Sequence, residues 1–208
     1  MASVTTPKRA PQIPKAQATK LFIEAVIELL ETRPIGDISD QLIADTAGIN
    51  RATIYRHFGT RFELLDAVVA ELTQQRLANA SEVVASADSE GLGSQQNPPL
   101  AKILPRGQMI FQLAAYLSAQ NYHSEKLRAS MGSLSDWWIE HLERLGVPTR
   151  MAKTLAFKNM TLSIARASAA DLFALTDDTV ADIEALALVE VANFKISAET
   201  LGWANNNS

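Results

Sequence analysis

Residues 39–61 read SDQLIADTAGINRATIYRHFGTR, and this stretch decides the fold of the chain around it. Ala44, Gly48 and Ile54 fall at the spacing of a helix-turn-helix. They supply a small residue at a helix crossing, a glycine for a left-handed turn, and an apolar residue for the second helix. Ile54 and Phe58 lie four residues apart and therefore share one buried stripe. The stretch predicts two short helices joined by a tight turn.

The helix starts in this region carry capping signals. Ser39 precedes the first helix and Asn50 precedes the second. Thr60 and Glu63 have the spacing of a capping box for the helix that follows. These signals agree with the apolar pattern on where each helix begins.

The second helix keeps an open polar face opposite its buried stripe. Guanidinium groups suit guanine edges and phosphates, hydroxyls suit phosphates, and a small alanine lets the backbone approach a groove. A solvated helix of an ordinary bundle is the alternative. The caps, the turn glycine and the buried stripe favour a nucleic-acid reader instead. The open face consists of Arg51, Ala52, Thr53, Tyr55 and Arg56.

This region resembles the tetracycline-repressor (TetR) family of bacterial regulators in the residues IADTAGINRATIYRHFGTRFELL. The resemblance spans residues 19–72 and implies an all-helical homodimer with an N-terminal operator-binding domain. Asp40 and Gln41 depart from the family pattern, which has an uncharged residue and often an arginine there. Both departures should weaken phosphate affinity. The resemblance implies contacts to bases or phosphates for Arg51, Ala52, Thr53, Tyr55 and Arg56, and contacts to the DNA backbone for Ser39, Gln41, His57 and Arg61.

The composition is that of a globular protein. The chain has 208 residues, of which 47% are apolar, and no cysteine. Thiol catalysis, disulfides and cysteine-based zinc sites are therefore excluded. The sequence has neither an apolar run long enough to span a membrane nor a secretory signal, so we expect a cytoplasmic protein.

Charge is distributed unevenly along the chain. The net charge is −4, but residues 1–61 carry +2 and residues 62–208 carry −6. A basic pole on an acidic body is typical of a DNA-binding head whose body resists non-specific binding. Residues 1–20 hold four basic residues and no acid.

The sequence predicts three regions and no strand. Three prolines make residues 1–14 a disordered basic arm, which either reaches a minor groove or is a solvated tail. Residues 15–61 form the helix-turn-helix domain, and residues 62–208 form a larger helical bundle for ligand binding and dimerisation. Residues 86–99 have loop composition. Outside the helix-turn-helix, helices are expected at 15–32, 60–85, 100–120, 123–131, 133–145, 148–175 and 178–203.

The last predicted helix is apolar over more than one face. One side can pack on the preceding helix, and a second subunit is expected to cover the other. A thick monomeric core is the alternative. The dimer interface is expected at Ile183, Ala187, Val191 and Phe194.

No catalytic constellation is present, so the chain is not expected to be an enzyme or to need a cofactor or metal. The three histidines lie far apart, and no nucleophile motif or phosphate loop occurs. Aromatic and methionine side chains instead gather between residues 108 and 138, where they either pack the core or line a ligand pocket. Adjacent tryptophans cannot both face one pocket. The candidates are Met109, Phe111, Tyr116, His123, Met131, Trp137 and Trp138.

Arg166 lies within an apolar helix, on one face with Asn159 and Ser163. A buried guanidinium must be compensated, so Arg166 either pairs with an acid or anchors an anionic ligand. It completes the candidate pocket.

Together with these patterns, the resemblance to the TetR family implies a homodimeric repressor that binds double-stranded operator DNA and is released by a small apolar or aromatic effector. Release would follow from a shift in the separation of the two recognition helices. The alternative is a helical DNA-binding adaptor that responds to a protein partner and has no pocket.

Overall fold

The computed structural model describes residues 13–89, 106–169 and 176–203. Regular structure in these ranges is helical throughout, with no strand, which confirms the all-α prediction. The chain divides into two compact units, Met1–Leu64 and Leu65–Ser208. Most of the predicted arm, and residues 90–99 of the predicted loop, lie outside the described residues.

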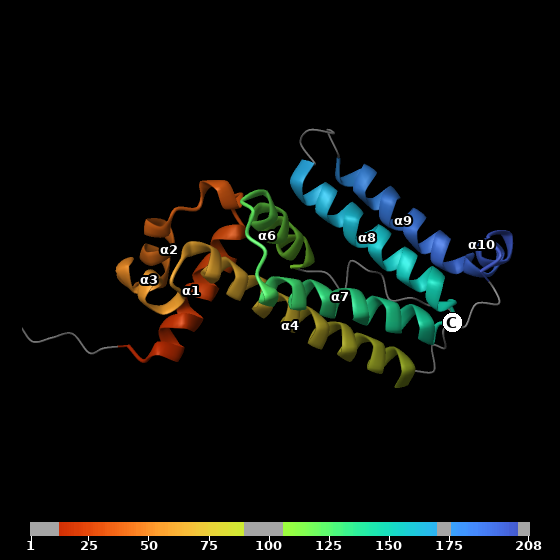
Figure 1. The fold of residues 1–208 in the computed structure, drawn as a ribbon, viewed down its shortest axis with the longest axis horizontal. Coiled ribbons are helices and arrows are strands. Elements are labelled where there is room, and N and C mark those ends of the chain that lie inside the picture. Colours follow the sequence, from red (N-terminus) through yellow and green to blue (C-terminus); the bar gives the residue numbers. More distant parts are fainter. Residues whose placement is uncertain (1–12, 90–105, 170–175, 204–208) are drawn as a thin grey trace, which may run out of the picture. The chain divides into compact units, whose positions relative to one another are not determined.

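The N-terminal unit is a small helical domain built around α1 (Figure 1). The buried face of α1 includes Phe22, Val26 and Leu29, as its apolar spacing predicts, and packs against α2 and α3. Phe22 meets Phe58 edge to face, with ring centroids 6.2 Å apart. Its elements are α1 (Lys15–Leu30), the 3-10 turn η1 (Ile35–Asp37), α2 (Asp40–Ala47), α3 (Ala52–Phe58) and the start of α4 (Arg61–Ser89).

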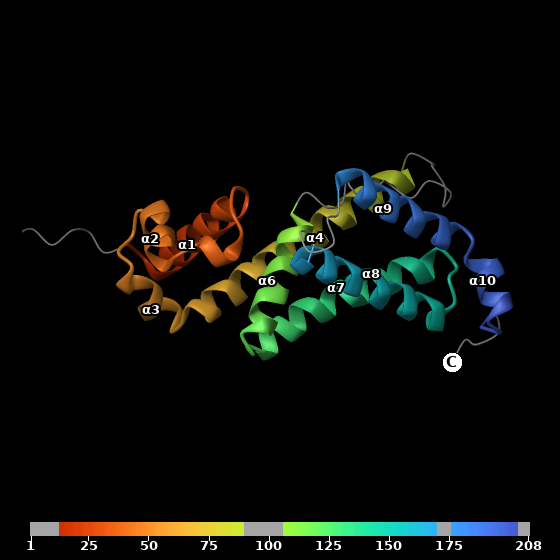
Figure 2. The same cartoon turned by 90° about the horizontal axis from the view of Figure 1, so that it is seen from above.

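The C-terminal unit is a helical bundle in which α8 packs against both α6 and α7. Figures 1 and 2 show α8 and α9 side by side, and an ion pair from Lys158 to Glu190 joins them. Beyond the rest of α4, its helices are α6 (Gly107–Ala119), α7 (Glu125–Arg144), α8 (Thr149–Ala169), α9 (Asp177–Ala192) and α10 (Phe194–Thr200).

The predicted turn at residues 132–133 is wrong, because α7 continues through it. Leu127, Ser130 and Leu134 are buried on one face, so the stripe that packs α7 is unbroken. The Ser133 hydroxyl donates a hydrogen bond to the carbonyl of Ala129, one turn earlier, at 3.0 Å. Gly132 therefore lies within a helix that tertiary packing stabilises.

The single predicted helix over 178–203 is divided at Asn193 into α9 and α10. The Asn193 side chain donates to the carbonyl of Val189 at 2.8 Å. After this break Phe194 and Ala198 join a buried cluster with Leu142 and Met151. The break in the helix thus lets α10 pack against α7 and α8 of the same chain.

In the part of the chain that the structure describes, no helix combines the length and the apolar character that a membrane span requires.

Candidate functional site

The turn between α2 and α3 forms as the sequence predicts. Ser39 caps α2 by accepting a hydrogen bond from the amide of Leu42 at 3.2 Å. Gly48 ends the helix with a φ of +66°, a backbone conformation that favours glycine. The amide of Ile49 then bonds to the carbonyl of Ala44, which is buried at the crossing.

Side-chain hydrogen bonds also fix the start of α3 and the start of α4. The Asn50 carbonyl oxygen Oδ1 accepts from the amide of Ala52 at 2.8 Å. Beyond α3, the amide of Thr60 donates to Glu63 Oε2 at 2.7 Å, and the amide of Glu63 donates to Thr60 Oγ1 at 3.1 Å. The predicted capping box is therefore confirmed. Since Ile54 is fully buried, α3 has one fixed inner face.

The opposite face of α3 exposes four of the five predicted recognition residues: Arg51, Ala52, Tyr55 and Arg56. The expectation for Thr53 is wrong, because only 8% of this residue is exposed. Thr53 lies beside Ile54 and one turn before the half-buried His57, so the inner face is wider than the Ile54–Phe58 stripe. Its Oγ1 accepts a hydrogen bond from Arg56 Nη2 at 3.2 Å and so helps to orient that guanidinium.

Asp40 links α2 to both α3 and the start of α4. Its Oδ2 accepts a hydrogen bond from the Tyr55 hydroxyl, and its Oδ1 accepts one from Arg61 Nη1 at 2.7 Å. Arg61 Nη2 also donates to the carbonyl of Ile38 at 2.6 Å and, at 3.3 Å, to that of Ile35. These internal contacts already occupy the guanidinium that the sequence assigned to the DNA backbone.

Ionisation of the Asp40–Tyr55 pair is mutually dependent. Partial burial raises the pKa of Asp40, but the hydrogen bonds from Tyr55 and Arg61 outweigh burial and leave the pKa below its usual value. The hydrogen bond to Asp40 and its negative charge raise the pKa of Tyr55 above 10. Tyr55 therefore stays protonated, and its hydroxyl is directed toward Asp40.

Replacing Asp40 by asparagine is expected to lower the pKa of Tyr55 toward its ordinary value of about 10, since the charged acceptor is lost. In the wild type the raised pKa means that this bond stabilises the fold below pH of about 10 and is lost as the pH rises through the folded-state value. Absorbance titration of tyrosinate measures the change, and Tyr55→Phe identifies the contribution of this side chain. An identical titration in Asp40→Asn would contradict the assignment.

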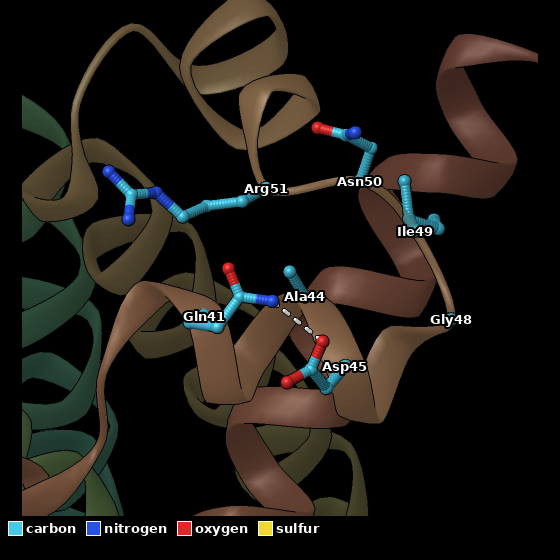
Figure 3. A pocket seen from close by; sticks show the side chains of 7 residues that line it. All are labelled: Gln41, Ala44, Asp45, Gly48, Ile49, Asn50 and Arg51. Carbon is cyan, nitrogen blue, oxygen red and sulfur yellow. Dashed lines mark hydrogen bonds between the residues drawn. The ribbon is translucent and has the colours of Figure 1, made fainter.

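The outward side of α2 carries a recess at the helix-turn-helix (Figure 3). Its volume is about 460 Å³, and Figure 3 shows the Gln41 side chain of α2 below that of Arg51, which precedes α3. Gln41 donates to Asp45 Oδ1 at 2.7 Å, which holds the amide group in place. The lining residues are Gln41, Ala44, Asp45, Gly48, Ile49, Asn50 and Arg51.

His57, the remaining predicted backbone contact, is half-buried at the end of α3. Burial, followed by the charges of Arg56 and Lys15, lowers its pKa. The imidazole is therefore neutral at pH 7 and can contact a phosphate only as a hydrogen-bond donor.

A second pocket lies among α6, α7 and α8, with a volume of about 410 Å³. Of the eight predicted ligand residues, it contains His123 and Met131. Tyr116 lies two positions from both Ala114 and Ser118, and Arg166 lies two positions after Ile164. At 100° per residue, each therefore lies on the side of its helix that faces away from the pocket. The lining residues are Ala114, Ala115, Ser118, His123, Leu127, Arg128, Met131, Phe157, Met160, Thr161 and Ile164. The predicted residues outside it are Met109, Phe111, Tyr116, Trp137, Trp138 and Arg166.

The two adjacent tryptophans pack around a buried histidine of α7 instead. The Trp137 ring stacks on His141 with a centroid separation of 5.2 Å, and Trp138 meets the same imidazole nearly at right angles. Both indoles therefore pack within α7, and neither lines the pocket among α6, α7 and α8.

Phe111 is buried, and the guanidinium of Arg76 from α4 lies over its ring, 5.6 Å from the centroid. The sequence analysis identified Phe111 but missed Arg76. A signal was present in the sequence, because Arg76 lies four residues from both Leu72 and Ala80 and so shares an apolar face of the predicted helix.

Of the four predicted dimer residues, the two with described side chains, Ile183 and Phe194, lie on different helices. Ile183 is exposed on α9, whereas Phe194 packs into the cluster that α7 and α8 form in the same chain. The half-buried Phe194 follows the break at Asn193 and packs on this cluster, and its place in a dimer interface stays a prediction. The side chains of Ala187 and Val191 lie outside the described residues.

Comparison with known proteins relates this geometry to a family. Residues 22–68 match the family described as "Bacterial regulatory proteins, tetR family". No curated protein matches the chain significantly. Among solved structures, the TetR family repressor AlkX from Dietzia sp. strain DQ12-45-1b, implicated in biodegradation of n-alkanes, matches with a TM-score of 0.45 and 15% identity. That match covers 85% of this chain and 95% of AlkX.

Proposed function

Since the chain belongs to the tetR family of bacterial regulatory proteins through its DNA-binding domain, we propose that it is a homodimeric repressor released from its operator by a small molecule. The resemblance found in the sequence is thus confirmed, and the chain is a DNA-binding regulator rather than an enzyme. Because its proposed target is operator DNA, we propose that it acts in the cytoplasm.

The observation that supports sequence-specific binding is the outer face of α3. Arg51, Tyr55 and Arg56 are exposed there, while Ile54 on the inner face is fully buried. A helix held in this way can enter a major groove, where guanidinium groups read guanine and contact phosphates. Thr53 orients Arg56 from behind rather than contacting DNA itself.

Arg51→Ala and Arg56→Ala are each expected to cost about 1–3 kcal/mol of operator binding, because each removes a guanidinium from this face. Titration against operator and scrambled duplexes at several salt concentrations measures the loss. Arg33→Ala is the matched control, since Arg33 is exposed in the same unit but lies outside α2 and α3. Operator affinity equal to wild type in both α3 variants would refute the proposal.

The support for a homodimer is the apolar surface that α8 and α9 leave exposed. Leu186 is 66% exposed and Val189 58%, and Phe157 and Leu162 are exposed on α8. Exposed apolar clusters of this kind are typical of subunit interfaces. Two half-sites about 34–36 Å apart would then be read by the two α3 helices of a dimer.

The support for a small effector is the pocket among α6, α7 and α8. Its lining is mainly apolar, with Ser118, His123, Arg128 and Thr161 as polar groups, which suits a mainly apolar or aromatic ligand. An effector that prefers the released state by about 10⁴-fold would reverse a 99:1 population. The adaptor alternative requires that no small molecule binds in this unit.

A further inference from the structure

The inner side of α4 carries polar groups at the spacing of a single helical face. Asp66, Thr73 and Arg76 are separated by seven and three residues, and each has a buried polar atom without a hydrogen-bond partner among the described residues. Asp66 is partly satisfied, because its Oδ2 accepts from Ser124 at 2.6 Å and from Tyr122 at 3.3 Å. Thr73 Oγ1 and Arg76 Nη1 have no such partner.

Arg76 has no acid within reach on its own helix. Positions three and four residues away on either side are Leu72, Thr73, Asn79 and Ala80. The contact recorded for its guanidinium in the described part of the chain is the ring of Phe111. Burial alone lowers the pKa of Arg76 to about 10, which still leaves the group charged at neutral pH.

Arg76 as a whole is half-buried, but its Nη1 is buried without a partner. Such a group is costly to a fold, and replacing it by an apolar side chain of similar size often stabilises a protein. A site with such a group is therefore suited to a ligand that supplies the missing negative charge. A guanidinium presents a planar fork that matches the two oxygens of a carboxylate. The Thr73 hydroxyl, one turn before Arg76, can donate a further hydrogen bond.

We propose that Arg76 is the anchor for the carboxylate of an apolar organic acid, whose ring or alkyl chain lies against Phe111. The proposal rests on the ligand-controlled function above and gives the effector a carboxylate anchor at Arg76 and Phe111, neither of which lines the pocket among α6, α7 and α8. A carboxylate is favoured over a phosphate, because one guanidinium and one hydroxyl match two oxygens with a single charge. Because α4 also contains Arg61 at its start, the ligand would act on the helix that follows the helix-turn-helix.

The first test uses the full-length protein without ligand. Arg76→Met removes the buried charge and keeps an unbranched apolar stem, so the melting temperature is expected to rise by about 2–4 °C. Arg144→Met is the matched control, since Arg144 is exposed on α7 and its loss should leave the melting temperature unchanged. A lower melting temperature in Arg76→Met would show that the fold itself satisfies this guanidinium, and would overturn the proposal.

The second test measures binding of octanoate and benzoate against their neutral counterparts, 1-octanol and benzyl alcohol, by calorimetry. Wild type and Arg144→Met are expected to bind whichever of octanoate and benzoate binds more tightly at least tenfold more tightly than the corresponding alcohol. Arg76→Met should lose this preference, and Arg76→Lys should keep part of it, because the charge remains without the planar fork. Acids that bind no better than alcohols, or an undiminished preference in Arg76→Met, would overturn the proposal.

Operator titration separates this inference from the proposed function. Ligand-free Arg76→Met is expected to bind operator as tightly as wild type, because Arg76 is remote from α3 along the chain. If wild type bound no duplex specifically, the repressor function would fail while the carboxylate measurement would still decide the role of Arg76.

Discussion

Arg61→Met is expected to lower the free energy of unfolding by about 3 kcal/mol. The Arg61 and Asp40 side chains are only 19% and 16% exposed, so losing the guanidinium leaves a mostly buried carboxylate unpaired. The carbonyl of Ile38 also loses the Arg61 donor, whereas that of Ile35 keeps the amide of Ile38. Urea unfolding followed by circular dichroism, with the operator absent, measures the effect.

The control for this experiment is Arg51→Met, an exposed position where the change in stability should stay within about 0.5 kcal/mol. Adding Asp40→Asn to Arg61→Met should recover part of the loss, because the unpaired charge is removed with its partner. If Arg61→Met were as stable as wild type but bound all duplexes more weakly, Arg61 would be a phosphate contact, as the sequence alone suggests.

Leu186→Glu is expected to abolish the proposed dimer. A charge buried without a partner costs about 3 kcal/mol. In a two-fold symmetric interface the substitution acts twice, so the dissociation constant should rise about 10⁴-fold. Sedimentation velocity at micromolar protein measures the shift to monomer, and the loss of cooperative binding to paired half-sites should accompany it.

The matched control is Glu199→Gln, an exposed position on α10 where no apolar surface is disturbed. A wild type that sediments as a monomer would contradict the dimer, whatever the variant does. A dimer that tolerates Leu186→Glu would instead place the interface away from the exposed residues of α9.

The local features of the helix-turn-helix were predictable from the sequence, because they depend on neighbours in the chain. Ser39, Gly48 and the Thr60–Glu63 box each act over three or four residues, and each forms as expected. The burial of Thr53 was not predictable from the helical periodicity alone, because the width of the buried face of α3 depends on how α1 packs against it.

The errors in the C-terminal unit have one physical origin. Gly132 signalled a turn, but the buried stripe of α7 continues past it, and Asn193 breaks a helix that composition alone makes continuous. The contacts of Arg61 and Arg76 also join residues more than twenty positions apart, which periodicity cannot pair. Tertiary packing decided each of these cases.

The carboxylate of Asp40 bears on how such a protein searches a genome. Asp40 accepts a hydrogen bond from Tyr55 and neutralises Arg61. The surface formed by α2, α3 and the start of α4 therefore presents less net positive charge than its arginines alone would give. Counterion release, which drives sliding along any duplex, is correspondingly reduced, while the exposed Arg51 and Arg56 remain able to read bases. Fewer molecules are then retained on the many competing genomic sites, so occupancy of the operator depends more on the match of its bases than on charge.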